Sequence, residues 1–143
     1  MEENLHCTTL APSADGVRRT LDEFERFGRA QGLPDDLRRR VLVALDEILT
    51  NISQHGGSAD HLILVDCTVA GDRLTVTVED PGSPFNPLHA PPADTTSPLE
   101  QRKAGGLGIE LVRRLFESVQ YEHTGSRNRL TITARISPDV NHP

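Results

Sequence analysis

The stretch VALDEILTNISQHGG, residues 43–57, decides how the rest of the sequence is interpreted. Apolar residues recur at helical spacing here and just before it, which predicts an amphipathic helix over residues 35–55 with one buried face. The predicted buried stripe consists of Leu37, Val41, Ala44, Leu45, Ile48 and Ile52. Glu47, Asn51 and His55 follow one another at four-residue steps and therefore form one row at the border of that face. Such a row can line a shallow pocket, although an ordinary amphipathic helix with a polar flank shows the same pattern.

The residue types in this row suit magnesium binding and proton transfer. Mg²⁺ takes oxygen ligands and is commonly held by one or two protein oxygens together with substrate phosphates. Asn51 offers one such oxygen, and Glu47, one turn earlier, could polarise a water molecule or a hydroxyl group. Asn51 is therefore the candidate metal ligand and Glu47 the candidate catalytic base.

A second stretch, VTVEDPGSPFNP, suits the base of a nucleotide. Asp80 ends a predicted strand, and an acceptor fixed at that point suits the exocyclic amine of adenine. Gly82 lets a base approach the backbone closely, and Phe85 follows it. The alternative for the same residues is a plain Asp-Pro-Gly turn.

A third stretch, RKAGGLGIELVRRLF, suits phosphate groups. Gly105, Gly106 and Gly108 stand at the mouth of a predicted helix, where free backbone N–H groups and the positive helix end form an anion site. Arg102 and Lys103, just upstream, could close on a terminal phosphate. A flexible connector whose glycines merely start a helix is the alternative.

Composition narrows the class of protein. The 143 residues fit one domain, and a net charge of −6 argues against nucleic acid as a direct partner. The sequence contains no basic region followed by a long apolar run and no apolar stretch of membrane-spanning length, so we expect a cytoplasmic protein without a membrane partner. Cys7 and Cys67 have no metal-ligand spacing and are expected to be buried free thiols.

The order of predicted elements indicates the fold class. A region with six prolines over residues 81–106 is expected to be a long loop, and long loops in compact domains are usually functional or disordered. Helices clustered with a mostly antiparallel sheet predict an α/β (α+β) two-layer sandwich. The expected elements are a strand at 4–10, helices at 14–31 and 35–55, strands at 61–69 and 73–80, the loop at 81–106, a helix at 107–117, strands at 118–124 and 129–136, and a tail at 137–143.

Together and in this order, the three stretches resemble the ATP-binding boxes of the GHKL superfamily, whose members share the Bergerat fold. DEILTNISQH resembles the N box, DPGSPF the first glycine box and GGLGIELV the second. The resemblance covers about residues 10–136 and is closest to the small anti-sigma regulatory serine/threonine kinases. It implies a single domain with a mixed, mostly antiparallel sheet, three main helices and an ATP lid over about residues 84–106.

The resemblance implies ATP and Mg²⁺ as ligands and assigns roles to individual residues. The glutamate matching Glu47 is taken as the general base, the asparagine matching Asn51 holds Mg²⁺, and the aspartate matching Asp80 contacts adenine. Asn128 stands where many members have threonine. The further residues that the resemblance assigns to nucleotide binding are His55, Gly82, Phe85, Arg102, Lys103, Gly105, Gly106, Leu107, Gly108, Ile109 and Asn128.

The resemblance also implies an activity and partners. The family transfers the γ-phosphoryl group of ATP to a serine or threonine of a STAS-type anti-anti-sigma protein and sequesters an RNA polymerase sigma factor, often as a dimer. Two other interpretations stay open. The chain could be a nucleotide-gated interaction module that binds ATP without transferring phosphate, or a detached sensor-kinase catalytic domain that acts on a separate histidine protein.

Overall fold

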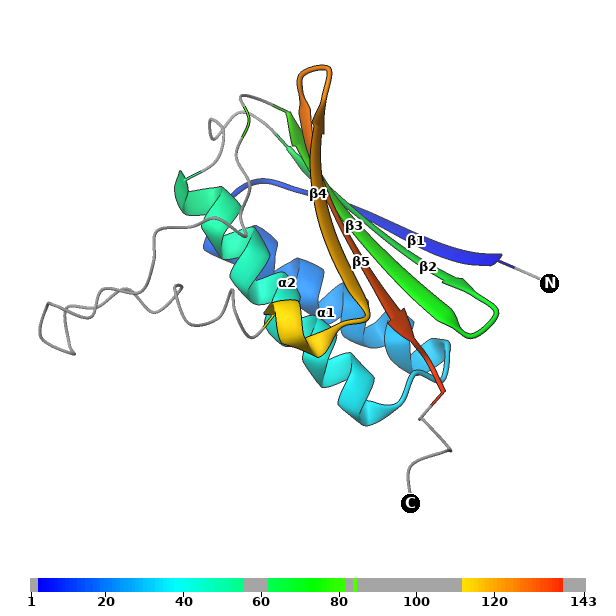
Figure 1. Cartoon of the computed structure of the whole chain (residues 1–143). Helices are drawn as coiled ribbons and strands as arrows, with labels where there is room; N and C mark the ends of the chain where they lie inside the picture. Colours follow the sequence, from blue (N-terminus) through cyan, green and yellow to red (C-terminus); the bar gives the residue numbers. More distant parts are fainter. Residues whose placement is uncertain (1–2, 56–61, 82–83, 85–111, 138–143) are drawn as a thin grey trace, which may run out of the picture.

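The computed structural model describes residues 3–55, 62–81, 84 and 112–137. Within these residues the chain forms two long helices and five strands, and residues 112–115 add a short helical stretch (Figure 1). In chain order the elements are β1 (Glu3–Leu10), α1 (Ala14–Ala30), α2 (Asp35–His55), β2 (Ile63–Ala70), β3 (Arg73–Pro81), β4 (Ser118–Thr124) and β5 (Arg127–Arg135).

The strands form one sheet in the order β1-β2-β3-β5-β4, and every described pair is antiparallel. The β2–β3 and β4–β5 connections turn at Gly71 and Gly125, whose φ angles are 60° and 64°. Glycine adopts this left-handed conformation without a Cβ clash. The central pairing of β3 with β5 brings Asp80 opposite Asn128. Both helices lie on one face of this sheet, so the predicted two-layer sandwich is confirmed (Figure 1).

Both helices begin where the sequence favours a helix start. The Ser13 hydroxyl accepts a hydrogen bond from the Gly16 amide at 3.1 Å and caps α1. Gly16 packs so closely that a Cβ would lie 2.4 Å from the Ala11 carbonyl oxygen. Asp35 and Asp36 occupy the first turn of α2, where negative charge is favourable.

A buried arginine fixes the start of α2 against α1. Arg38 is 9% exposed and donates to the Leu33 carbonyl at 2.6 Å. Its guanidinium also pairs with Asp35 and, at 3.4 Å, with Glu25 of α1. Gly28 leaves room for this side chain, because a Cβ there would lie 2.8 Å from Arg38 Cδ. These contacts set the position of α2 and therefore of the candidate residues Glu47 and Asn51 that it carries.

The core fills the space between the helices and the sheet. Leu49 of α2 is fully buried although it lies outside the predicted stripe, so the buried face of the helix is wider than predicted. Burial of an aliphatic side chain of this kind contributes about 1.5–3 kcal/mol. The predicted stripe itself is buried throughout: Leu37, Val41, Ala44, Leu45, Ile48 and Ile52.

The two cysteines lie on opposite faces of the sheet. Cys67 is buried in the core as predicted, and burial raises the pKa of its thiol to about 12. Cys7 is exposed on the face away from the helices, so the prediction that it is buried is wrong. The reason is that no described helix covers that second face (Figure 1). Both cysteines are free thiols.

Some element boundaries differ from the prediction. The strand expected at 129–136 runs over Arg127–Arg135, because the tight turn at Gly125 lets pairing begin at Arg127. The helix expected at 107–117 is described only over 112–115. Apart from residues 81 and 84, the predicted loop over 81–106 lies outside the described residues.

None of the described helices is both long enough and apolar enough to cross a membrane.

Candidate functional site

Helix α2 places Glu47 and Asn51 one turn apart at the border of its buried face, as predicted. Asn51 is 5% exposed and Glu47 is half-buried. The two side chains share a hydrogen bond in which the Asn51 amide donates to the Glu47 carboxylate. His55, the third member of the row, ends α2, and its side chain lies outside the described residues.

The carboxylate of Glu47 is incompletely satisfied. Its Oε1 atom is buried and has no hydrogen-bond partner in the described part of the chain. Burial, and then repulsion from neighbouring Asp46, raises the pKa of Glu47, and the hydrogen bond from Asn51 opposes that change. An unpaired buried acceptor costs on the order of 1–3 kcal/mol, and such groups cluster at functional sites. This environment suits a group that gains a partner when a ligand or a proton donor binds.

A second pair of buried polar residues lies on the sheet. Asp80, near the end of β3, is 4% exposed, and its register partner Asn128 on β5 is 3% exposed. Both lie on the face that the helices cover, because each is two residues from a core residue of its own strand, Val78 for Asp80 and Leu130 for Asn128. The predicted position of Asp80 at a strand end is therefore confirmed, and the structure adds its pairing with Asn128.

The sequence did not predict that Tyr121 lies next to Asn128. The hydroxyl of Tyr121 on β4 donates a hydrogen bond to Oδ1 of Asn128. Alternation in SVQYEHT places Tyr121 on the same face as Val119 and His123, which is a signal for its facing but not for its partner. The contact between Tyr121 and Asn128 depends on the register between β4 and β5, which the sequence of either strand alone does not give.

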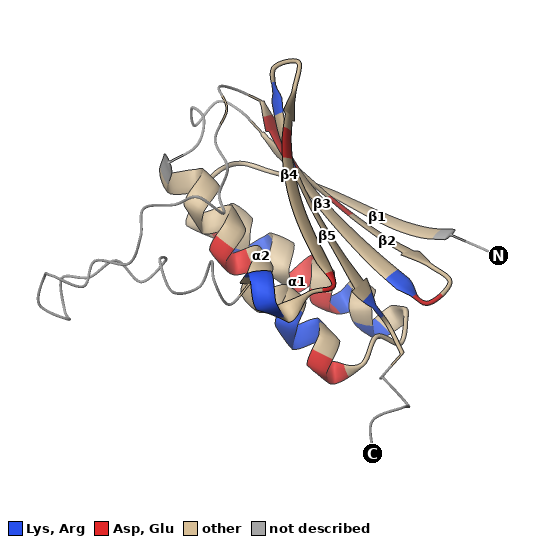
Figure 2. Cartoon of the chain, in the orientation of Figure 1, with Lys and Arg blue, Asp and Glu red and all other residues tan. Residues whose placement is uncertain are grey.

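The two pairs lie at the same end of the molecule. In Figure 1, the His55 end of α2 and the Pro81 end of β3 both lie toward the top, as does the β4–β5 turn. Figure 2 shows acidic residues on the second half of α2, and both acidic and basic residues on the sheet near the β4–β5 turn, where Glu79 pairs with Arg127 and Arg129. Residues 41–55 contain no lysine or arginine. This half of α2 therefore offers a triphosphate negatively charged side chains only, and a cation between them would offset the repulsion.

The donor set at this end fits a magnesium ion. Asn51 donates to Glu47 through its amide nitrogen, so the Asn51 oxygen is not used in that contact. Among the described residues no group of three or more His, Cys, Asp or Glu side chains gathers into a metal cluster. Mg²⁺ needs no such cluster when one or two protein oxygens and substrate phosphates complete its shell. The negative charge of Asp46 and Glu47 on this half of α2 agrees with that mode of binding.

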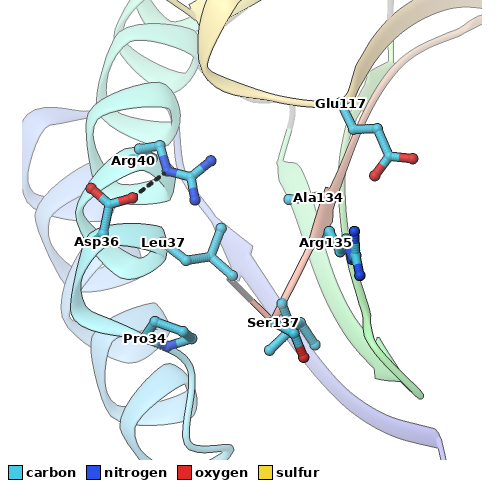
Figure 3. Close-up of a pocket in the computed structure, with 9 residues that line it drawn as sticks. Pro34, Asp36, Leu37, Arg40, Glu117, Ala134, Arg135 and Ser137 are labelled. Atoms are coloured by element: carbon cyan, nitrogen blue, oxygen red, sulfur yellow. Dashed lines mark hydrogen bonds and ion pairs between the residues drawn. The ribbon is translucent and has the colours of Figure 1, made fainter. Parts of the chain in front are cut away.

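A cavity of about 660 Å³ lies at the other end of α2 (Figure 3). Its charged groups already have partners: Arg40 contacts Asp36 at 3.1 Å and the Leu115 carbonyl at 2.8 Å. Glu117 contacts Arg73 at 3.4 Å. The lining residues come from the start of α2, the end of β5 and the residues beside them: Pro34, Asp36, Leu37, Arg40, Glu117, Ala134, Arg135, Ile136 and Ser137.

Several candidate residues fall outside the described part of the chain. Their assignment to the nucleotide site stays a prediction from the sequence. They are Gly82, Phe85, Arg102, Lys103, Gly105, Gly106, Leu107, Gly108 and Ile109.

Two curated proteins show sequence similarity to the chain. The serine/threonine-protein kinase BtrW of Bordetella bronchiseptica is 27% identical over 105 residues, which cover 72% of this chain and 74% of BtrW. The sensor histidine kinase CusS of Escherichia coli is 30% identical over 131 residues, which cover 79% of this chain and 26% of CusS. The chain therefore matches most of BtrW but only about a quarter of CusS.

Solved structures share the fold. The RsbU and RsbW domains of Rv1364c from Mycobacterium tuberculosis superpose with a TM-score of 0.70 at 18% identity, covering 95% of this chain and 33% of that one. The histidine kinase AdeS of Acinetobacter baumannii superposes with a TM-score of 0.51 at 18% identity, covering 94% of this chain and 70% of that one. The chain thus spans about a third of the length of the mycobacterial chain.

The family comparison agrees with the geometry of the site. The sequence matches the family described as the histidine kinase-like ATPase domain over residues 10–134. This range contains Glu47, Asn51, Asp80 and Asn128, the four buried or half-buried polar residues of the two pairs. The chain therefore belongs to the histidine kinase-like ATPase domain family.

Proposed function

We propose that the chain is an ATP-dependent serine/threonine protein kinase that acts as an anti-sigma regulatory factor. In this role it phosphorylates a STAS-type anti-anti-sigma protein and sequesters an RNA polymerase sigma factor. The family match over residues 10–134 and the similarity to BtrW, a serine/threonine-protein kinase, support the proposal. The single observation that carries it is the Glu47–Asn51 pair, a half-buried base next to a buried amide.

Glu47 has the properties that a general base requires. In the reaction, the hydroxyl oxygen of the acceptor attacks the γ-phosphorus, the bond to the bridging oxygen breaks, and ADP leaves. Glu47 would take the hydroxyl proton on Oε1, the atom that has no partner among the described residues. Its raised pKa makes it a stronger base than an ordinary carboxylate. A well-placed base contributes about 10²–10⁴-fold to the rate.

The other residues would hold the nucleotide. Asn51 would bind magnesium through its amide oxygen, while its nitrogen keeps Glu47 in place. Magnesium, when bound, neutralises phosphate charge. Asp80 would accept a hydrogen bond from the adenine amine, since a buried carboxylate is an acceptor only. The predicted basic pair, Arg102 and Lys103, would supply positive charge that residues 41–55 lack.

Transfer of labelled phosphate tests the proposal. The purified chain is incubated with Mg²⁺, [γ-³²P]ATP and a panel of STAS-domain proteins from the same genome. We expect acid-stable label on a serine or threonine of one STAS protein. Glu47→Gln should slow transfer about 10²–10⁴-fold while changing the Kd of Mg-ATP by less than about 3-fold. Glu117→Gln is the matched control, because it makes the same change at an exposed glutamate beside the cavity at the other end of α2, and it should retain transfer.

Other results would contradict the proposal in distinct ways. ATP binding without label on any acceptor would favour a nucleotide-gated interaction module. Acid-labile label on a histidine would favour a sensor-kinase catalytic domain. Equal rates for the wild type and Glu47→Gln would remove Glu47 from the role of base.

A further inference from the structure

We infer that Arg39, Val43 and Arg114 form a docking surface for the phosphoryl acceptor protein, and that this acceptor carries acidic side chains near the hydroxyl group that it presents. We call these three residues the arginine surface. The inference rests on the proposed function, because it concerns the protein that receives the phosphoryl group. It goes beyond that function by naming the surface that recognises the acceptor and the charge that the acceptor must bring.

The row of Glu47 and Asn51 continues toward the start of α2. Val43 and Arg39 precede Glu47 by four and eight residues, so they lie along the same side of the helix. The row turns gradually outward, because Asn51 is 5% exposed, Val43 is 47% exposed and Arg39 is exposed. Eight residues of α-helix span roughly 12 Å. A protein that contacts Arg39 and Val43 therefore lies close enough to bring a hydroxyl group to Glu47.

The short helical stretch at residues 112–115 adds a second arginine beside the first half of α2. Nη1 of Arg40 donates to the Leu115 carbonyl oxygen at 2.8 Å, which holds the stretch against α2. Phe116, which follows it, is buried, whereas Arg114 is exposed. Figure 2 shows the basic part of this stretch next to the basic part of α2. The two segments, far apart in the sequence, thus present their arginines on one side of the molecule.

The charges of Arg39 and Arg114 are available to a partner. Neither side chain has a hydrogen bond or an ion pair with another described residue. The acidic side chains nearby do not neutralise them, since each is paired with a different arginine: Asp35 with Arg38, Asp36 with Arg40, and Glu117 with Arg73. The arginine surface is therefore a local positive region on a chain whose net charge is −6.

This combination of groups fits an acidic protein surface. The guanidinium group matches a carboxylate with two parallel hydrogen bonds, and Val43 adds apolar contact area between protein surfaces. Complementary charge at the edge of an interface speeds encounter and fixes the orientation of the partner. An acceptor oriented in this way presents its hydroxyl group toward Glu47. A second copy of this acidic chain is the alternative occupant of the surface.

Charge reversal tests the inference in steady-state transfer to the STAS protein that takes the label. Arg39→Glu and Arg114→Glu replace attraction by repulsion, so each should raise the KM for the acceptor about 5-fold, and the double variant about 20-fold. The kcat and the Kd of Mg-ATP should change less than about 2-fold, because the contacts are the same in the ground state and the transition state. Retained ATP affinity also shows that the variants fold.

Arg73→Glu is the matched control. It makes the same charge reversal at an exposed arginine beside the β2–β3 turn, away from the arginine surface. Its register partner on β5 is Arg135, which can pair with the new glutamate. The KM for the acceptor should therefore stay at the wild-type value.

Salt dependence and oligomeric state add two further readouts. The wild-type KM should rise with NaCl concentration, and the double variant should lose most of that rise, because salt screens a charge attraction between exposed groups. Sedimentation of the wild type and the double variant should give the same oligomeric state. A double variant that changes oligomeric state and retains the wild-type KM would assign the surface to a second copy and overturn the inference.

The remaining contradicting results separate the inference from the function on which it rests. A wild-type protein that labels an acceptor, with the KM unchanged in the double variant, overturns the inference and leaves the proposed function intact. A fall in kcat at constant KM also overturns it, because docking would then not depend on these arginines. A wild-type protein that labels no acceptor overturns the proposed function and the inference together.

Discussion

The two ends of helix α2 differ in how their polar side chains are satisfied. At the first end, beside the cavity of Figure 3, Arg40 pairs with Asp36 and the Leu115 carbonyl. At the second end, the buried Oε1 of Glu47 has no hydrogen-bond partner in the described residues. A cavity whose polar groups are already paired can match a ligand only in shape. A buried oxygen without a partner also gains free energy when a ligand supplies a hydrogen bond to it. This difference is the reason that we propose the nucleotide site at the second end and not at the cavity.

The largest effect on nucleotide affinity is expected on the sheet, beside the second end of α2. Asp80→Asn replaces a buried carboxylate acceptor by an amide and should raise the Kd of Mg-ATP about 10- to 100-fold, as for loss of a hydrogen bond to a charged group. Calorimetry checks the change. Glu79→Gln is the control, since Glu79 lies on the opposite face and pairs with Arg129 at 2.6 Å. Wild-type ATP affinity in Asp80→Asn would show that adenine does not contact Asp80.

A smaller effect, on stability alone, is expected at the cavity end. Arg40→Ala removes the hydrogen bond to Leu115 and the ion pair with Asp36, and should lower the free energy of unfolding by about 1–2 kcal/mol. Urea denaturation measures this change. The Kd of Mg-ATP should stay the same. A tenfold loss of ATP affinity in Arg40→Ala would reverse the comparison between the two ends.

The smallest effect is a gain of stability at the second end of α2. The raised pKa of Glu47 means that its ionisation costs free energy in the folded state, so the stability contributed by this group falls as the pH rises through its unfolded and then its folded pKa. Glu47→Gln should therefore stabilise the protein at neutral pH, by less than about 1 kcal/mol because solvent screens a half-exposed carboxylate. The gain should vanish well below the ordinary glutamate pKa of about 4.3. Urea denaturation at several pH values measures the difference in free energy of unfolding between Glu47→Gln and the wild type. A difference that stays constant with pH, or that has the opposite sign, would contradict this prediction.

The helices and strands could be predicted because hydrophobic periodicity is a local property. The spacing of Leu37, Val41 and Ile48 fixes the buried face of α2, and the alternation in LTVTV fixes the faces of β3. Leu49 was missed because the buried face of α2 is wider than the predicted stripe. The exposure of Cys7 depends on which face of the sheet the helices cover, and local pattern does not contain that information.

The candidate site could be predicted only in part. Glu47 and Asn51 belong to one helix, so their spacing alone places them together. The pairing of Asp80 with Asn128, and the contact of Tyr121 with Asn128, depend on strand register between segments far apart in the sequence. Register follows from the whole sheet and not from any one strand. The predicted phosphate-binding residues of the third stretch lie outside the described residues and stay predictions.

One measurement compares the two ends of α2 directly. Mg-ATP is titrated into ¹⁵N-labelled protein, and the shifts of backbone and side-chain amide signals are mapped onto the sequence. We expect the largest shifts at Glu47, Asn51, Asp80 and Asn128. The signals of Leu37, Arg40 and Ile136 should stay unchanged. Shifts concentrated at the cavity residues, or an unchanged spectrum at saturating Mg-ATP, would contradict it.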